Sequence, residues 1–206
     1  MRVTWLGHAC FMLESEGYQV VLDPFTRVPG LKDVHTKADL VLCSHEHYDH
    51  HYLEGVTMRT GGKNPFTVET VDTFHDAKEG ALRGKNTVHL LRTEGLTAVH
   101  LGDLGHRLAE TQAAPLRHCD VLLIPVGGTY TMDGALAAET VQQLQPRVVV
   151  PMHYRSATFG FDNIDGVEPF IKALPTWSVR RYEESSLDLT ADTETQIALL
   201  KPQLHV

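Results

Sequence analysis

The sequence has few cysteines, no long apolar run and no recognisable leader, and each absence excludes a class of protein. The three cysteines, Cys10, Cys43 and Cys119, show no paired spacing, and the first two stand in apolar runs. This is typical of buried thiols in a reducing compartment rather than of a disulfide framework. No apolar run approaches the roughly 18 residues of a membrane-spanning helix. The N-terminal segment is interrupted by His8 and Glu14, so it lacks the apolar centre of a signal peptide. We therefore expect a cytoplasmic protein that does not bind membranes.

Basic residues are also in deficit. The chain has 18 Lys and Arg against 26 Asp and Glu, a formal net charge of −8, and no basic block. Because a nucleic-acid surface needs positive charge to neutralise phosphates, we expect no nucleic-acid partner. With 42% hydrophobic and 21% charged residues over 206 positions, the composition favours one globular domain spanning residues 1–206.

Short strands dominate the predicted secondary structure. Ten β-branched or apolar runs, from "RVTW" and "CFMLE" to "WSVRRY" and "TQIALLK", are bounded by Gly, Pro or acidic turns. The clearest helix follows Asp133, a plausible N-cap, and ends before Pro146. Further helices are expected over 165–174 and after Asp49, with a short helical turn in "ETQAAPLRH".

The two halves of the sequence resemble each other at an offset of about 80 residues. The segment 11–23 resembles 89–103, since both read as strand, Glu-Gly turn, apolar strand and Asp. The segment 38–45 then resembles 119–126, and each half continues to a strand that ends at a histidine, His75 or His153. The shared order favours an ancestral duplication that places polar residues at the ends of strands.

The stretch "SHEHYDHH" (44–51) is the densest group of possible metal ligands. In an extended segment, His45 and His47 point the same way and could share one ion. A turn into a helix would then bring Asp49 and His50 to a neighbouring position, where they could bind a second ion. Imidazole and carboxylate groups are the ligands expected of Zn²⁺, Mn²⁺ or iron.

Three residues elsewhere could complete such a pair of sites. Asp103 follows the strand "TAVHLG", and its carboxylate, placed between the ions, could bridge both. His75 and His153 end the equivalent strands of the two halves and could complete one ion each. A solvated polar loop without a metal is the alternative interpretation for residues 44–51. For Asp103, His75 and His153 the alternative is an ordinary buried or surface residue.

With these motifs together, the sequence resembles the metallo-β-lactamase superfamily. The resemblance rests on His-x-His-x-Asp-His after an apolar strand, followed by His75, "GDLG" and "PMH". The segments "WLGHACFML", "DP" and "IPVGG" are similar to the stand-alone zinc-dependent hydrolases that include the ascorbate-6-phosphate lactonases. The resemblance to the superfamily extends from Val3 to about Arg155.

The resemblance implies an α/β fold, a four-layer αβ/βα sandwich of two duplicated halves, with a dinuclear site at one edge. It assigns His45, His47 and His75 to one metal and Asp49, His50 and His153 to the other, with Asp103 bridging. It also implies that Asp23 orients the histidine loop by hydrogen bonds. The cofactors would be two divalent ions, zinc first, with manganese or iron as alternatives.

The function implied is hydrolysis of a small anionic ester, lactone or phosphodiester by a metal-bridging hydroxide, which Asp49 would orient. The chain departs from other branches of the family. It has no room for the flavin domain, cap domain or C-terminal helical domain that some carry, and Asp103 stands where antibiotic-degrading members often have cysteine. An iron-dependent oxygenase and a non-catalytic metal-binding or regulatory protein remain alternatives.

Several residues near these motifs are candidates for further roles. Arg83 and Arg155 could bind an anionic group of the substrate, and Tyr130 could donate a hydrogen bond to an oxyanion. His8 and His106 lie beside motif residues and could support ligands or shuttle protons. The segment 155–163 after His153 could form a lid. Solvated surface charges and ordinary buried or packing side chains are the alternatives.

Overall fold

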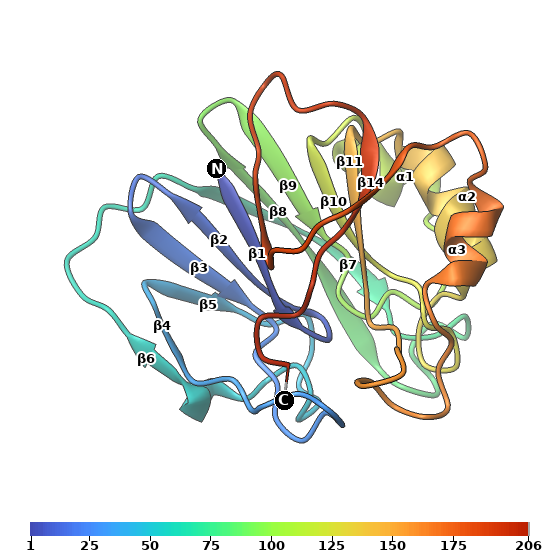
Figure 1. Ribbon diagram of the computed structural model, residues 1–206, viewed down its shortest axis with the longest axis horizontal. Helices are drawn as coiled ribbons and strands as arrows, with labels where there is room; N and C mark the ends of the chain where they lie inside the picture. Colours follow the sequence, from blue (N-terminus) through green and yellow to red (C-terminus); the bar gives the residue numbers. More distant parts are fainter. Residues whose placement is uncertain (206) are drawn as a thin grey trace.

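Two β-sheets face each other and contain most of the regular structure (Figure 1). The computed structural model describes residues 1–205. The smaller sheet has the strand order β13-β1-β2-β3-β5 and the larger has β12-β14-β11-β10-β9-β8-β7, while β4 and β6 form a separate pair. The strands are β1 (Arg2–Gly7), β2 (Cys10–Ser15), β3 (Tyr18–Leu22), β4 (Thr36–Ala38), β5 (Leu40–Leu42), β6 (Val56–Met58), β7 (Thr67–Phe74), β8 (Lys85–Thr93), β9 (Leu96–His100), β10 (Val121–Pro125), β11 (Val148–Met152), β12 (Val179–Arg181), β13 (Ser186–Asp188) and β14 (Gln196–Leu199).

The outer faces of the two sheets are covered differently. Helices α2 (Gly134–Leu144) and α3 (Glu168–Ala173) pack together on the side of the larger sheet, and α1 (Glu110–Ala113) continues into the 3₁₀ helix η2 (Ala114–Leu116) (Figure 1). On the smaller sheet, the segment 24–35 and the β4–β6 pair replace helices. Their apolar side chains form a second buried cluster with those of β1–β3, which includes Leu6, Val21, Phe25, Val28 and Val34.

The sandwich architecture predicted from the sequence is confirmed, and the internal resemblance corresponds to a real structural repeat. Strands β2 and β3 form an antiparallel hairpin, and β5 pairs with β3 in parallel. Strands β8 and β9 form the matching hairpin, and β10 pairs with β9 in parallel. The last part of the match does not correspond, because β7 lies antiparallel to β8 in the larger sheet.

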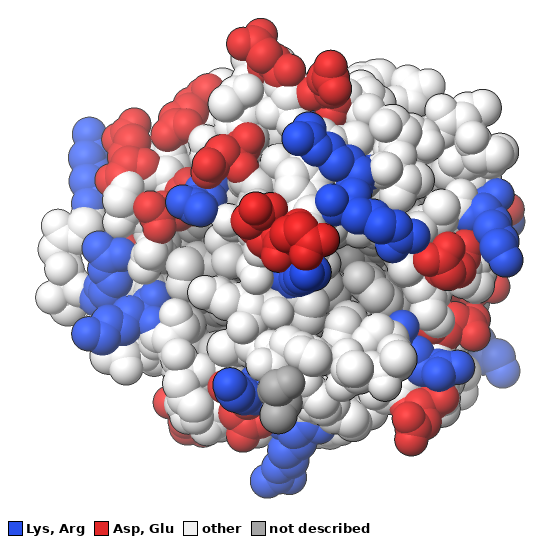
Figure 2. Space-filling view, in the orientation of Figure 1, with Lys and Arg blue, Asp and Glu red and all other residues white. Residues whose placement is uncertain are grey.

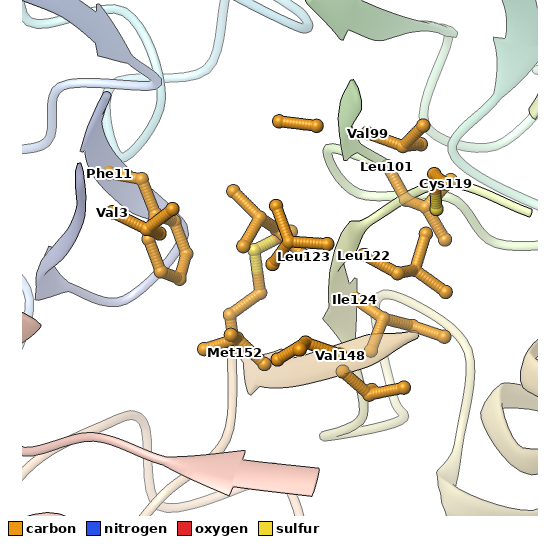
Figure 3. Close-up of a cluster of buried hydrophobic side chains, with 14 of the residues drawn as sticks. Val3, Phe11, Val99, Leu101, Cys119, Leu122, Leu123, Ile124, Val148 and Met152 are labelled. Atoms are coloured by element: carbon orange, nitrogen blue, oxygen red, sulfur yellow. The ribbon is translucent and has the colours of Figure 1, made fainter. Parts of the chain in front are cut away.

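The central strands are buried on both faces, which explains their continuous apolar sequences. In β10 every residue is buried, and Leu123 points toward Val3 and Phe11 of the smaller sheet (Figure 3). Leu122 and Ile124 point to the opposite side of β10, where the helices lie (Figure 3). The core between the sheets and the core under the helices are therefore built from alternate residues of the same strands.

Helix α2 forms where the sequence predicts it. The Asp133 side chain accepts a hydrogen bond from the Leu136 N–H at 2.8 Å, which caps the first turn. Ala137, Val141 and Leu144 are buried at helical spacing, so one face packs on the sheet. Gln145 then adopts a left-handed conformation before Pro146, and the helix ends.

The helix predicted after Asp49 is wrong. Residues 48–50 form a single turn, closed by the His50 N–H donating to the His47 carbonyl at 2.8 Å, and a 3₁₀ helix η1 (Leu53–Gly55) follows. The Tyr52 N–H donates instead to the carbonyl of Pro24, outside the segment. Backbone groups that would continue an α-helix are thus used to tie this loop to the segment after β3. The helix expected over 165–174 is present but shorter, as α3.

Charged side chains are mixed on the face of the molecule in Figure 2, where Lys and Arg alternate with Asp and Glu without a continuous basic patch. Among residues 1–205, no helix has the length and apolar character needed to span a membrane.

Two histidines face each other across the hydrogen-bonded strands β8 and β9. His89 pairs with His100, and the two residues are 4% and 0% exposed. The His100 Nε2–H donates to the Ala9 carbonyl at 2.8 Å, while its Nδ1 accepts from the Gly102 N–H at 3.1 Å. That pair of contacts requires a neutral imidazole. Burial lowers the pKa of His89 to about 4.

We expect acidification to destabilise the metal-free protein through His89. In the unfolded chain His89 has a pKa of 6.5 and binds a proton below that pH. In the folded protein it binds this proton only below a pH of about 4. The free energy of unfolding therefore falls as the pH drops from about 6.5 to 4, by about 3 kcal/mol for this residue. Urea unfolding across this pH range should show a shallower pH dependence for His89→Leu than for the wild type. The exposed control His118→Leu should follow the wild type, and parallel curves for wild type and His89→Leu would contradict the prediction.

Candidate metal centre

The seven ligands predicted from the sequence meet at one edge of the two sheets. The loop after β5 provides His45, His47, Asp49 and His50. Strands β7, β9 and β11 end just before the other three, which are His75, Asp103 and His153. Because these strands end at the same edge, residues far apart in sequence become neighbours.

The donor atoms form two groups. In the first, His45, His47 and His75 each offer a ring nitrogen, and these atoms lie within 4.8 Å of one another. The second group contains Asp49, His50 and His153 under the same limit, and His8 lies with them. These are the two sets of three that the family resemblance assigns to separate ions, with one histidine added to the second.

Asp103 lies between the two groups. Its Oδ2 is 3.2 Å from Nε2 of His75 in the first group. The same oxygen is 3.2 Å from Nε2 of His50 and 3.2 Å from Nε2 of His153 in the second. A carboxylate in this position can contact ions in both groups at once.

Asp23 fixes the loop that carries the first four ligands. Its Oδ1 accepts from the Ser44 N–H at 2.7 Å, and its Oδ2 accepts from the Ser44 hydroxyl at 2.6 Å. The same Oδ2 accepts from Nδ1–H of His50 at 2.8 Å, which directs Nε2 toward Asp103. Asp23 is fully buried directly after β3, so its three hydrogen bonds determine the position of the loop.

The turn at Gly102 and Asn86 positions Asp103. The Asn86 side chain accepts from the Asp103 N–H at 2.8 Å and donates to the Leu101 carbonyl at 2.9 Å. Gly102 has φ +56, and an added Cβ would lie 2.4 Å from the Asn86 side-chain oxygen and 2.4 Å from Ser44 Cβ. A glycine is therefore required between β9 and Asp103.

His75 and His153 are oriented by main-chain contacts. Nδ1–H of His75 donates to the Tyr130 carbonyl at 3.0 Å, which leaves Nε2 facing Asp103. His153 has a left-handed backbone with φ +53, and its N–H donates to the His8 carbonyl at 3.2 Å. Non-glycine residues rarely adopt this conformation, and they retain it only where the surroundings impose it.

The protonation states suit cation binding. Burial disfavours the charged forms of Asp49 and Asp103, but neighbouring histidines lower the pKa of both carboxyl groups below the ordinary value. Burial lowers the pKa of His45 to about 3 and that of His8 to about 4, so both rings are neutral at pH 7. Although burial acts in the opposite direction, Asp103 and Asp23 raise the pKa of His50, which holds a proton next to these carboxylates. A bound cation would take the place of that proton.

Unpartnered polar atoms provide a direct test of the fit. Among residues 1–205, the buried side-chain atoms without a hydrogen-bond partner include Nε2 of His45 and Oδ1 of Asp103. Both ring nitrogens of His8 belong to the same set. Leaving a polar atom buried and unpaired costs about 1–3 kcal/mol, and most of the unpaired atoms here converge on one place. The chemistry and positions of these residues therefore suit metal binding.

A cavity of about 350 Å³ opens onto the two donor groups. Its lining includes Arg83 and Tyr130, with the Arg83 guanidinium 5.6 Å from the centre of the Tyr130 ring. The Tyr130 hydroxyl accepts a hydrogen bond from the Asn163 side chain. Tyr48 and Phe161 also line it.

The loop that carries Arg83 is organised by Asp76, the residue after His75. One carboxylate oxygen accepts from the N–H groups of Lys78 and Gly80, and the other accepts from those of Leu82 and Arg83 at 3.1 and 2.8 Å. Four backbone donors on one carboxylate hold the loop in a fixed shape next to the first donor group.

Two of the predicted site residues lie away from this cavity. Arg155 lines a different cavity, and its Nε–H donates to the Ile164 carbonyl at 2.6 Å, so the structure does not support a substrate contact. Nε2 of His106 accepts from the Phe74 N–H at 3.1 Å beside His75, but the ring faces another groove.

The segment 155–163 forms part of the wall of the site. Phe161 lines the cavity, while Phe159 packs at 5.8 Å against the rings of Trp5 and Tyr154. The Gly160 N–H donates to the Pro29 carbonyl at 2.9 Å. One aromatic residue is thus anchored in the core while the other faces the ligands.

Several supporting residues give little or no signal in the sequence. Asn86 is only the second residue of β8, and Tyr48 lies between predicted ligands, where an aromatic residue carries no specific meaning. Asp76 could have been found, because Asp followed by Lys, Glu and Gly is typical of a side chain that caps its own turn.

Comparison with known proteins identifies relatives of this architecture. A sequence profile for the beta-lactamase superfamily domain matches residues 2–153. A metal-dependent hydrolase of the group UPF0173 from Carboxydothermus hydrogenoformans is 31% identical over 76% of this chain and 85% of its own length. Another from Hyperthermus butylicus is 29% identical over 97% of this chain and 96% of its own.

A solved structure from Thermotoga maritima resembles the whole chain. It has a TM-score of 0.76 and 36% sequence identity, and the match covers 97% of each chain. That protein is described as a Zn-dependent hydrolase of the metallo-beta-lactamase superfamily.

Removing the charge of Asp23 should weaken metal binding without removing a predicted ligand. In Asp23→Asn the amide cannot accept from Ser44 and His50 as the carboxylate does, so the loop loses its fixed orientation. We expect metal affinity to fall about 10- to 100-fold, measured by competition with a chromophoric chelator. Asp120→Asn is a matched control, because Asp120 also accepts from a backbone N–H and an arginine but lies elsewhere. Equal affinities in wild type and Asp23→Asn would contradict the prediction.

Proposed function

The chain belongs to the beta-lactamase superfamily as a metal-dependent hydrolase, and on this premise we propose that two divalent ions act together in its site on a small anionic ester, lactone or phosphodiester. The observation that carries the proposal is the arrangement of two donor groups joined by Asp103. We further propose that residues 1–206 act as one domain. A cytoplasmic location remains our prediction, supported by three cysteines that form no disulfide.

His45, His47 and His75 would hold one ion, and Asp49, His50 and His153 the other, with Asp103 shared. Zinc agrees best with a set of imidazole and carboxylate donors, and manganese or iron can use the same donors. Two divalent ions bound there would supply hydroxide at neutral pH and polarise the carbonyl or phosphoryl oxygen of the substrate.

Side chains in the cavity wall would position the attacking water and the substrate. Asp49 lies in the cavity wall and is ionised, so it can accept a hydrogen bond from the attacking water and hold it toward the substrate. The Tyr130 hydroxyl accepts from Asn163, which leaves its own O–H free to donate to an oxygen of the substrate. Phe161 and Tyr48 would limit the access of bulk water.

Charge favours an anionic substrate. Asp23, Asp49, Asp103 and one hydroxide would balance the charge of two divalent ions, so Arg83 in the cavity wall leaves the site with a net positive charge. Among residues 1–205, no carboxylate forms an ion pair with Arg83. A phosphate or carboxylate on the substrate could therefore occupy the guanidinium without displacing a protein partner.

The first experiment is elemental analysis of protein purified without added metal, followed by assays with esters, lactones and phosphodiesters. About two zinc or manganese ions per chain with hydrolytic turnover would support the proposal. Tightly bound iron with oxygen consumption would contradict it in favour of oxygen chemistry. Bound metal without turnover on any of these classes would support a non-catalytic role.

Removing Asp103 should disrupt both ion sites at once. In Asp103→Ala the shared carboxylate is lost while the six other donors stay, so we expect metal content below two per chain and activity lower by a factor of about 100 or more. Metal is measured by elemental analysis and activity on the best substrate found. Asp72→Ala, at an exposed aspartate of β7, is the control. Full metal content together with full activity in Asp103→Ala would show that Asp103 does not bridge.

Removing Arg83 should affect anionic substrates selectively. Arg83→Met retains much of the side-chain volume but loses the charge, so we expect KM for an anionic substrate to rise about 10- to 100-fold, the loss of a charged hydrogen bond. A neutral analogue of the same substrate should change little. Arg107→Met, at an exposed arginine paired with Glu139, provides the control. An equal effect on charged and neutral substrates would show that Arg83 acts only on the shape of the site.

A further inference from the structure

We propose that His8 is a metal ligand, and that Nε2 of His8 binds the same ion as Asp49, His50 and His153. This inference rests on the proposed two-ion function and adds a fourth protein donor, beside the shared Asp103, to one of its sites. It also makes the two sites unequal, since the other site has three histidines apart from the shared Asp103.

The His8 side chain is enclosed without a partner. It is 1% exposed, and neither ring nitrogen has a hydrogen-bond partner among the described residues. The rings of Phe25 and Phe161 lie 6.2 and 5.6 Å from the imidazole, both edge-on, and offer no acceptor. A neutral imidazole buried in this way leaves a donor and an acceptor unsatisfied, which costs about 1–3 kcal/mol for each group. An ion at Nε2 would satisfy one of the two.

The distances are those of neighbouring ligands. Nε2 of His8 is 3.4 Å from Oδ2 of Asp49, and the His8 ring lies 4.2 Å from that of His153 and 5.2 Å from that of His50. Donors bound at about 2.0–2.2 Å to one ion, with bonds 90–120° apart, are separated by about 2.8–3.8 Å. A charged hydrogen bond between imidazole and carboxylate would be shorter, at about 2.7–2.9 Å. The separation from Asp49 therefore matches a shared ion better than a direct hydrogen bond.

The backbone directs His8 into the site. His8 has φ +52 between β1 and β2, just after the register of the two strands shifts between Trp5 and Gly7. Its carbonyl accepts from Nε1–H of Trp5 at 3.0 Å and from the N–H of His153 at 3.2 Å. These two contacts fix a conformation that is unfavourable for histidine, and one of them ties His8 to another donor of the same group.

Cobalt binding can test this assignment without any substrate. Metal-free wild type, His8→Asn and His8→Gln are titrated with Co²⁺, and the stoichiometry, affinity and visible d–d spectrum are recorded. Asn tolerates positive φ but is too short to place its oxygen at the position of Nε2, whereas the longer Gln can present an oxygen near it. His118→Asn is the matched control, because His118 has φ +56 and is exposed outside the site.

In His8→Asn we expect one of two cobalt ions to bind at least tenfold more weakly, with a changed d–d band. His8→Gln should recover part of the affinity, and His118→Asn should match the wild type. Wild-type affinity and spectrum in both His8 variants would overturn the inference.

If the wild type binds only one ion, the two-ion proposal fails, and the His8 assignment holds only if His8→Asn weakens the binding of that ion. If His8→Asn does not fold, as judged by circular dichroism of the metal-free protein, the spectrum of His8→Gln decides: a changed d–d band supports the assignment and an unchanged one overturns it.

Discussion

Burial of like-charged carboxylates at the edge of an apolar sandwich is the constraint on which the site depends. Asp23 and Asp103 are almost completely enclosed, at 0% and 2% exposure, yet both are ionised. Without compensation, each would cost several kcal/mol in such surroundings. Asp23 is compensated by three hydrogen bonds, whereas Asp103 is surrounded by imidazole nitrogens that can equally bind cations. This difference separates a carboxylate that builds the loop from one that is available to a metal ion.

The two sheets contribute rigidity and the loops contribute chemistry. Each donor stands beyond the end of a strand, from one residue for His75 and His153 to eight for His50 after β5, where the ladder no longer determines the backbone. Left-handed residues and a close-packed glycine then set the direction of the side chain, as at His153 and Gly102. The strands thus determine where each donor residue lies at the edge of the sheets, and local turn geometry determines the direction of its side chain.

Much of this organisation could be predicted from the sequence, because strands and their ends have local signals. The hairpins and the capped helix after Asp133 follow from periodicity and turn residues, whereas the convergence of donors at one edge was implied by the resemblance to the metallo-β-lactamase superfamily. The helix after Asp49 was predicted wrongly, since local pattern did not show that the Tyr52 N–H is used by Pro24. The position of Arg155 in another cavity was not visible in the sequence for the same reason, because its contact with the Ile164 carbonyl follows from tertiary packing.

Tyr130 contacts the predicted ligand His75 through its main chain and the cavity residue Arg83 through its side chain. Its carbonyl accepts from His75, and its ring lies against the Arg83 guanidinium. Binding free energies at linked positions are reciprocal. If an occupant at Arg83 moved Tyr130 and so changed the affinity of His75 for a metal ion, the metal ion would change the affinity for that occupant by the same factor. An anion bound in this cavity and a metal ion bound at His75 would therefore be thermodynamically coupled.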